Sequence, residues 1–124
     1  MKKILSTLML LAVVMMASAQ AQIKFDKVLH NYGTFKENDG VQSCKFEFTN
    51  VGDAPLVINQ AVASCGCTVP SYPKAPIKPG EKGEIVVKYN GTGKFPGHFK
   101  KTVTVRTNGK VEMTRLYVEG EMTE

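Results

Sequence analysis

The sequence is poor in the side chains that most often carry chemistry. Its 124 residues include no tryptophan, two histidines and three cysteines. It contains no Gly-x-Ser-x-Gly elbow, no phosphate-binding loop ending in Gly-Lys-Ser/Thr and no His-Glu-x-x-His pair. Because hydrolytic and phosphoryl-transfer enzymes depend on such arrangements, we predict that the protein is not an enzyme and binds no cofactor.

The sequence also lacks a large excess of charge of one sign. The formal net charge is +5, and Lys2 and Lys3 contribute two of these charges. The other basic residues are scattered, with no dense run of lysine and arginine. Mild, dispersed positive charge is typical of a solvated surface, so we predict no nucleic-acid partner.

A long apolar run occurs only once, at the start of the chain. Residues 4–16 are mostly apolar, follow the two lysines and lead into the small residues Ala17-Ser18-Ala19. This order of charged, apolar and small residues is that of a cleavable secretory signal peptide. The run is shorter than the roughly 20 apolar residues that a spanning helix needs. We therefore predict a signal peptide over residues 1–21 and no membrane span after its cleavage.

The end of this leader can be placed in two ways. Cleavage after Ala19 or after Ala21 satisfies the preference for small residues at alternate positions, and the sequence slightly favours the second. The mature domain would then cover residues 22–124. The first cysteine, Cys44, is far from this junction, whereas a lipid-anchored protein needs a cysteine as its first mature residue. We expect an exported protein, periplasmic or extracellular, that is not lipid-anchored.

The mature region is patterned as strands. Short runs rich in Val, Ile, Thr, Phe and Tyr alternate apolar with polar residues, which indicates half-buried strands rather than helices. In one of these runs Leu56, Ile58 and Val62 share a parity, so we expect them on one face. The expected strands cover residues 23–26, 44–49, 56–59 continuing towards 62, 84–89, 99–106 and 116–118.

Turn residues separate these runs. Asn108-Gly109 is a strong hairpin signal because both residues tolerate positive φ. Prolines at positions 70, 73, 76 and 79 predict that residues 69–80 form an extended connection with little regular structure. His30 lies where an extended segment meets a turn. About seven short strands in roughly 100 residues predict an all-β fold, an immunoglobulin-like β-sandwich of about seven antiparallel strands.

The segment Cys65-Gly66-Cys67 is the most distinctive chemical feature. Residues two apart in an extended segment point to the same side, so the two sulfurs would lie close together. Three interpretations stay open. The cysteines are small apolar thiols packed at the edge of the core; or one of them forms a disulfide, with the other or with Cys44, as export permits; or both bind a soft ion such as copper(I) or zinc.

Completing a metal site would be difficult. A closed zinc site needs about four ligands, and the only further candidates are Cys44, His30 and His98, all distant in sequence. We interpret the two histidines as surface or capping residues. We therefore predict no metal ligands beyond the weak candidates Cys65 and Cys67, and we retain Cys44, Cys65 and Cys67 as candidates for a disulfide or thiol site.

Several motifs spread along the mature region occur in a distinctive order. They are Tyr32-Gly33-Thr34-Phe35, Phe46-Glu47-Phe48-Thr49-Asn50-Val51-Gly52, Pro55-Leu56-Val57-Ile58, Ser64-Cys65-Gly66-Cys67-Thr68, Ile77-Lys78-Pro79-Gly80-Glu81-Lys82-Gly83 and Leu116-Tyr117-Val118-Glu119-Gly120. In this order they resemble the DUF1573 family of bacterial envelope proteins. The resemblance extends from about residue 23 to residue 120.

The resemblance has implications for fold and for function. It implies a seven-stranded sandwich similar to the modules of major sperm protein and Hydin, which bind other proteins, and it implies no enzyme activity. The family's marker pair corresponds to Cys65 and Cys67. Cys44 lies where the family pattern more usually has another residue, which counts against a site built from three cysteines.

Two functions follow as hypotheses. In the first, the protein is a binding or scaffold module of the cell envelope, whose partner is another envelope protein or a peptide paired with an exposed sheet edge. In the alternative, it is a thiol-redox or soft-metal (copper or zinc) binding protein that uses Cys65-Gly66-Cys67.

Overall fold

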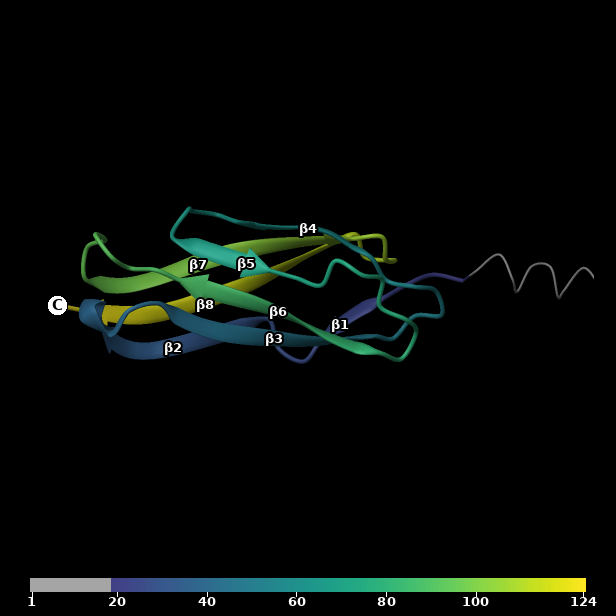
Figure 1. Ribbon diagram of the computed structural model, residues 1–124, viewed down its shortest axis with the longest axis horizontal. Coiled ribbons are helices and arrows are strands. Elements are labelled where there is room, and N and C mark those ends of the chain that lie inside the picture. The colour runs from purple at the N-terminus through teal and green to yellow at the C-terminus, as the bar shows by residue number, and fades with distance from the viewer. Residues whose placement is uncertain (1–18) are drawn as a thin grey trace, which may run out of the picture.

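The chain folds into two packed β-sheets (Figure 1), as seen in a computed structural model that describes residues 19–124. Residues 1–18 of the predicted leader lie outside this part of the chain. The first sheet has the strand order β1-β3-β6-β5 and the second has the order β2-β8-β7-β4. The strands are β1 (Ile23–Phe25), β2 (Leu29–Lys36), β3 (Gln42–Asn50), β4 (Ile58–Ala63), β5 (Thr68–Ser71), β6 (Lys82–Tyr89), β7 (Gly97–Thr107) and β8 (Met113–Thr123).

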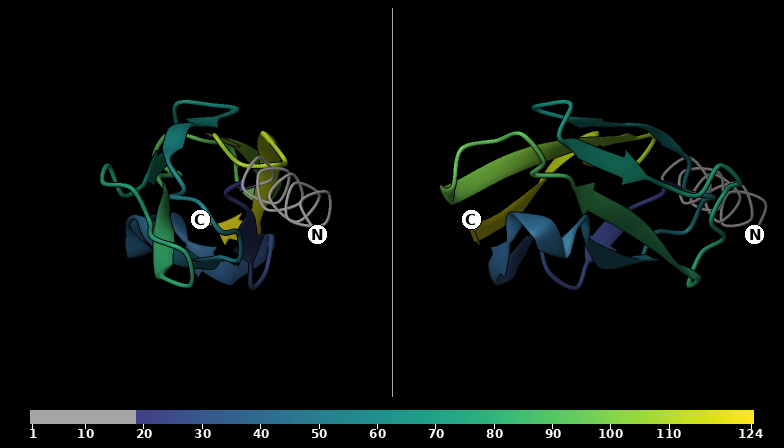
Figure 2. Two further views of the ribbon diagram at one scale, coloured as in Figure 1. Left: turned by 90° about the vertical axis from the view of Figure 1, so that its right-hand side faces the viewer. Right: turned by 60° about the vertical axis from the view of Figure 1, so that its left-hand side comes forward.

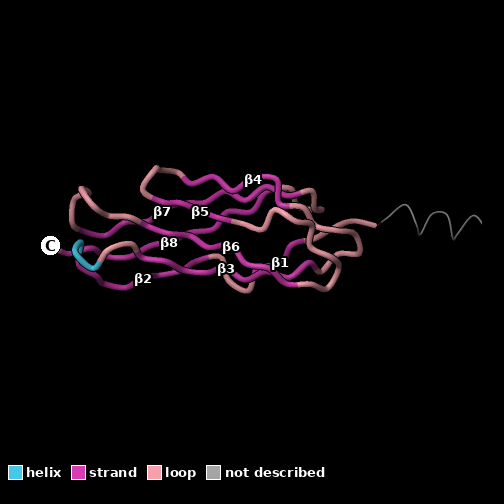
Figure 3. The backbone as a smooth tube through the Cα atoms, viewed as in Figure 1, coloured by secondary structure: helices cyan, strands magenta, loops and turns pink. Residues whose placement is uncertain are grey.

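The two layers face each other along the length of the molecule (Figure 2). One short 3-10 helix (Glu37–Asp39) lies at the same end as the C-terminus (Figure 3), and residue 19 enters at the opposite end. No helix within residues 19–124 is long and apolar enough to cross a membrane. The predicted all-β sandwich is confirmed, and the structure corrects the strand count from about seven to eight.

The prediction that all strands are antiparallel is wrong for one pair. Strand β2 pairs with β8 in parallel, and the register shifts between Asn31 and Thr34. Within this irregularity Gly33 has a φ of 75°, a conformation that glycine adopts without steric cost. The turn expected beside His30 is therefore a bulge inside a strand. Because the bulge residues resemble a turn, the sequence pattern did not predict strand β2.

The proline-rich connection contains one strand that the sequence did not predict. Strand β5 includes Pro70 and lies at the edge of the first sheet, where it pairs only with β6. Proline is tolerated at a sheet edge because its missing N–H can face away from the neighbouring strand. Pro70 is thus compatible with a place in the sheet, and the other three prolines follow the end of β5.

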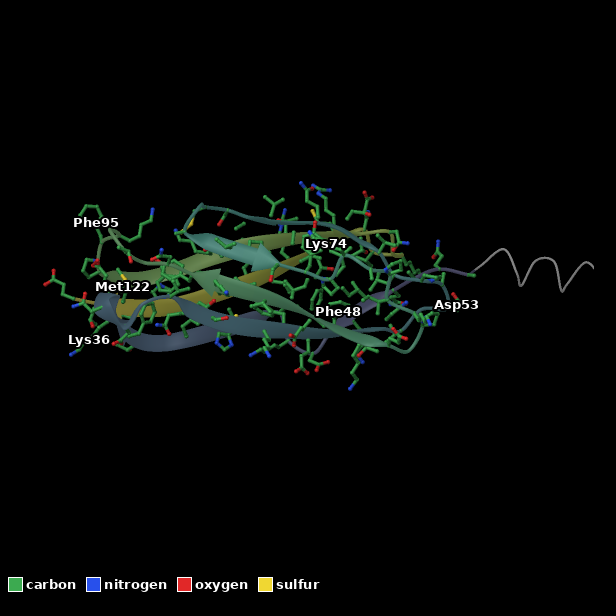
Figure 4. All side chains as sticks on the ribbon, in the orientation of Figure 1. Lys36, Phe48, Asp53, Lys74, Phe95 and Met122 are labelled. Atoms are coloured by element: carbon green, nitrogen blue, oxygen red, sulfur yellow. A yellow bond between two sulfur atoms is a disulfide. The ribbon has the colours of Figure 1, made fainter. Side chains whose placement is uncertain are left out.

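The core lies where most of the period-two patterns placed it. The alternating residues of β3, β6, β7 and β8 turn one face inward, so that each strand contributes fully buried side chains. The largest of these are Phe46 and Phe48, and Phe48 lies in the interior of the molecule (Figure 4). The central buried side chains are those of Phe46, Phe48, Leu56, Ile85, Val87, Val103, Val105, Leu116 and Val118.

Strand β4 departs from its predicted face. Leu56 and Ile58 are buried as expected, whereas Val62 is 47% exposed. The register of β4 on β7 shifts between Ile58 and Gln60, and this bulge reverses the parity of all later residues. Ala61 and Ala63 consequently pack against the core in place of Val62.

The predicted hairpin between β7 and β8 forms, although its turn is different. Residues 108–112 connect the two strands, and neither Asn108 nor Gly109 has a positive φ. The Asn108 side chain instead accepts a hydrogen bond from Val57 N at 2.8 Å and donates one to Pro55 O at 3.2 Å. The turn is thus stabilised by side-chain bonds to the segment that leads into β4.

Asn50 is the main polar group of the interior. Its side chain is fully buried, and its Nδ2 donates hydrogen bonds to Ala54 O and Ile77 O, both at 2.9 Å. Its Oδ1 accepts bonds from Gly52 N at 3.0 Å and Gln22 N at 3.3 Å. One amide therefore links the N-terminal segment, the turn after β3 and the loop before β6.

Replacement of Asn50 by alanine tests this role. The substitution Asn50→Ala leaves several buried backbone groups without partners, and we expect it to reduce the free energy of unfolding by about 2–4 kcal/mol. Urea unfolding followed by circular dichroism measures the change. The control, Asn59→Ala, alters an exposed side chain on β4 and should leave the midpoint unchanged. Equal midpoints for the two variants would contradict the role given to Asn50.

Candidate functional site

Cys65 and Cys67 lie in the turn that carries the chain from β4 in one sheet to β5 in the other. They form a disulfide with each other, and their Cα atoms are 5.4 Å apart. A Cβ atom placed on Gly66 would meet nothing within 4 Å, so the apex of the turn faces open space. Of the three interpretations of these cysteines, the described geometry is that of a disulfide within the pair.

A second apolar cluster packs against this disulfide. It contains buried Cys67, Phe35, Tyr89 and Met122, with Phe99 packed against it. The rings of Tyr89 and Phe99 stack with centroids 3.9 Å apart and planes inclined by 9°. The sulfur pair therefore has one side on an aromatic and methionine cluster, while its glycine apex is open.

Cys44 lies apart from the other two cysteines. It belongs to the main core, where its Sγ donates to the Tyr32 hydroxyl at 3.5 Å, and this hydroxyl in turn donates to Val87 O at 2.8 Å. Burial raises the pKa of the Cys44 thiol, which therefore stays protonated and unreactive at neutral pH. The structure does not bring the three cysteines together.

The two histidines also lie apart from the disulfide. His30 Nδ1 is 2.8 Å from Lys27 Nζ, and its pKa is lowered by burial and then by the Lys27 charge. His98 Nε2 is 3.6 Å from Glu119 Oε2 on the outward side of β7. Among residues 19–124 no group of three His, Cys, Asp or Glu side chains is placed to hold a metal ion.

The edges of the sheets form a second candidate site. The first sheet ends in β1, which has three residues, and in β5, which contains Pro70. The second sheet ends in β2, which carries His30 and Lys36, and in β4. Strand β4 has the sequence INQAVA, without charge or proline. Natural edge strands are usually protected by such residues. Strand β4 has only the bulge after Ile58 as protection, and the residues beyond that bulge form the least protected edge.

The backbone of β4 presents hydrogen-bonding groups away from β7. Ser64 N donates to Thr102 O at 2.9 Å, which fixes the alternation along the strand. By this alternation Ala61 and Ala63 direct their N–H and C=O groups outward. The Asn59 carbonyl, on the same parity, accepts a bond from the Tyr72 hydroxyl at 3.5 Å, which agrees with this assignment.

A hollow of about 360 Å³ lies beside this edge on the outer face of the second sheet. It is mostly uncharged, with hydroxyl, amide and small apolar side chains and one guanidinium. Its lining residues are Gln60, Val62, Ala63, Ser64, Thr102, Thr104 and Arg106. No local pattern indicates this site, because its residues come from two segments distant in sequence and because a bulge after Ile58 reverses the parity of the later β4 residues.

Solved structures show the same fold in proteins of low sequence identity. A protein of unknown function from Porphyromonas gingivalis W83 has a TM-score of 0.71 and 17% identity, over 85% of this chain and 48% of that one. PapD-like domain 7 of human CEP192 has a TM-score of 0.68 and 8% identity, over 85% of this chain and 87% of that domain. The periplasmic chaperone SfaE has a TM-score of 0.65 and 11% identity, over 83% and 58%.

These likenesses establish an immunoglobulin-like fold of the PapD type. The chain spans about half the length of the Porphyromonas protein. No curated protein matches the sequence. A family model, described as a protein of unknown function (DUF1573), matches residues 23–122. That match covers nearly all of the described region and confirms the resemblance seen in the motifs, so the chain belongs to the DUF1573 family.

Proposed function

We propose that this protein is an exported, non-enzymatic binding module of the bacterial cell envelope, which pairs the edge strand β4 with an extended segment of another envelope protein. The observation that carries the proposal is the uncharged, proline-free β4 edge. Main-chain groups of Ala61 and Ala63 point outward there, beside a hollow that could receive small side chains. Immunoglobulin-like neighbours that include a periplasmic chaperone support a binding role without identifying a partner.

The groups along the β4 edge indicate which side chains a partner segment would have. An added strand would bond with its main chain to Ala61 and Ala63, and every second side chain would face the hollow. Because the hollow is lined mainly by threonine, serine and amide groups, small neutral side chains fit it best. Arg106 at its border favours an acidic residue at one end of the segment. The expected partner is therefore a neutral extended peptide with an acidic end.

The substitution Val62→Lys tests edge pairing. It places a charge on the outer face of β4 without changing the core, and charge on an edge strand opposes the addition of another strand. We expect capture of partners from envelope extract to fall at least about tenfold, the equivalent of roughly 1.4 kcal/mol. Affinity purification with quantitative mass spectrometry measures the retained proteins.

The matched control is Val69→Lys on β5. Val69 is 57% exposed against 47% for Val62, and it lies on the edge strand that contains Pro70. We expect this variant to retain the partners, and both variants should have the wild-type urea midpoint. A second variant, Ala61→Pro, removes one outward N–H and should act like Val62→Lys. If Val62→Lys and Val69→Lys retain the same proteins, edge pairing through β4 is wrong.

The Cys65–Cys67 disulfide favours thiol redox chemistry as the second candidate function. Reduction by an external dithiol would add two electrons and two protons to the sulfurs and open the bond, while the dithiol becomes a disulfide. The open apex at Gly66 supports access for such a reagent. This function uses different residues from edge pairing, so the two can be tested separately.

Thiol counting tests the assigned cysteine states. In the native protein we expect no alkylation, because Cys44 is buried and the other two cysteines are paired. Unfolding should expose one thiol, and unfolding with reduction should expose all three. Mass spectrometry of the alkylated protein gives the number directly. Alkylation of Cys65 or Cys67 in protein that was never reduced would exclude a resident disulfide.

A further inference from the structure

The segment that precedes β1 is built into the domain. The Gln20 carbonyl accepts a hydrogen bond from Asp53 N at 3.0 Å, and the Gln22 carbonyl accepts one from Val51 N at 2.8 Å. Between them, the Ala21 carbonyl accepts a bond from the N–H of Lys110 at 2.9 Å. The segment therefore has strand-like bonds on two sides, to the turn after β3 and to the connection between β7 and β8.

Ala21 is part of the core. Its side chain is only 3% exposed and belongs to the same cluster as the central residues of both sheets. An alanine in this position closes the end of the sandwich where the chain enters. A domain that began after Ala21 would lose this buried side chain and the hydrogen bond from Lys110 N to the Ala21 carbonyl.

Two glycines allow the chain to pass close to residues 20–22. A Cβ atom on Gly52 would overlap the Gln20 carbonyl oxygen and lie 2.6 Å from Gln22 N. Gly52 does not have a positive φ, so close approach rather than backbone conformation requires glycine there. Gly109 approaches from the other side, where a Cβ atom would lie 3.1 Å from the Ala21 carbonyl oxygen.

Asp53 meets the start of the segment. Its Oδ1 accepts a hydrogen bond from Gln20 N at 2.7 Å, and Asp53 lies at the end of the molecule where the chain enters (Figure 4). In the unprocessed chain this nitrogen belongs to the peptide bond with Ala19. If that bond is cut, the same nitrogen becomes an α-ammonium group beside a carboxylate, and the hydrogen bond becomes charge-assisted.

We propose that the leader is removed between Ala19 and Gln20, so that Gln20-Ala21-Gln22 is the first structural segment of the mature protein and its α-ammonium group pairs with Asp53. Hydrolysis of the Ala19–Gln20 bond consumes one water molecule and leaves a carboxylate on Ala19 and an ammonium on Gln20. The sequence alone slightly favoured cleavage after Ala21. This inference rests on one part of the proposed function, the export of the protein, and does not depend on edge pairing.

Intact-mass analysis of the exported protein tests the junction. The full chain is expressed in a bacterial host, and the processed form is purified from outside the cytoplasm. We expect Gln20 as its first residue. A first residue of Gln22 would overturn the proposed junction and leave export intact, whereas a chain that retains its leader would overturn export itself.

A variant within the leader separates the two junctions further. Ala17 occupies the required small position only for cleavage after Ala19, because cleavage after Ala21 uses Ala19 and Ala21. The substitution Ala17→Leu should therefore abolish the form that begins at Gln20, without changing any residue of the mature domain. An unchanged mature mass in this variant would overturn the proposal.

Hydrogen exchange tests the structural role of the segment. In the mature protein the amides of Val51, Asp53 and Lys110 should exchange slowly, because they donate to the segment. Gly52→Ala should release this protection at least about tenfold. The control Gly66→Ala, where a Cβ atom has open space, should leave it unchanged. Fast exchange of these three amides in the wild-type protein would overturn the structural role.

Discussion

The interaction on which the rest of the structure depends is the set of hydrogen bonds made by the buried side chain of Asn50. One amide bonds to backbone groups of Gln22, Gly52, Ala54 and Ile77, which belong to segments far apart in the sequence. Burying this amide without hydrogen-bond partners would cost more free energy than the formed bonds contribute. The turn after β3 and the segments that bond to Asn50 must therefore keep one arrangement. The entry end of the sandwich is therefore held by these polar contacts together with the apolar packing of Ala21.

The opposite end is organised by different chemistry. The disulfide of Cys65 and Cys67 rests on Tyr89, Phe99 and Met122, where the main core gives way to a smaller aromatic cluster. A bond across one glycine adds little restraint to a long chain, because the loop that it closes is so short. Its effect is local, since it holds the connection from β4 to β5 and so fixes the end of the exposed β4 edge.

The β4 edge shows how a small irregularity creates a candidate binding surface. The bulge after Ile58 turns two alanines inward and moves Val62 outward, so the strand presents an uncharged face while its neighbour β7 supplies Thr102 and Thr104. The other edges are short, proline-containing or charged. A strand added to this sheet would therefore meet the β4 edge in preference to the others.

The sequence by itself determined the all-β sandwich and the inward faces of β3, β6, β7 and β8, because period-two alternation and turn residues are local signals. The family followed from the order of the motifs along the chain. It could not determine the parallel pairing of β2, the strand in the proline-rich connection or the reversed parity of β4, since each depends on which strand lies alongside. Only the tertiary structure separated Cys44 from the Cys65–Cys67 pair and placed Ala21 in the core. Those outcomes depend on contacts between residues distant in sequence, which no local pattern records.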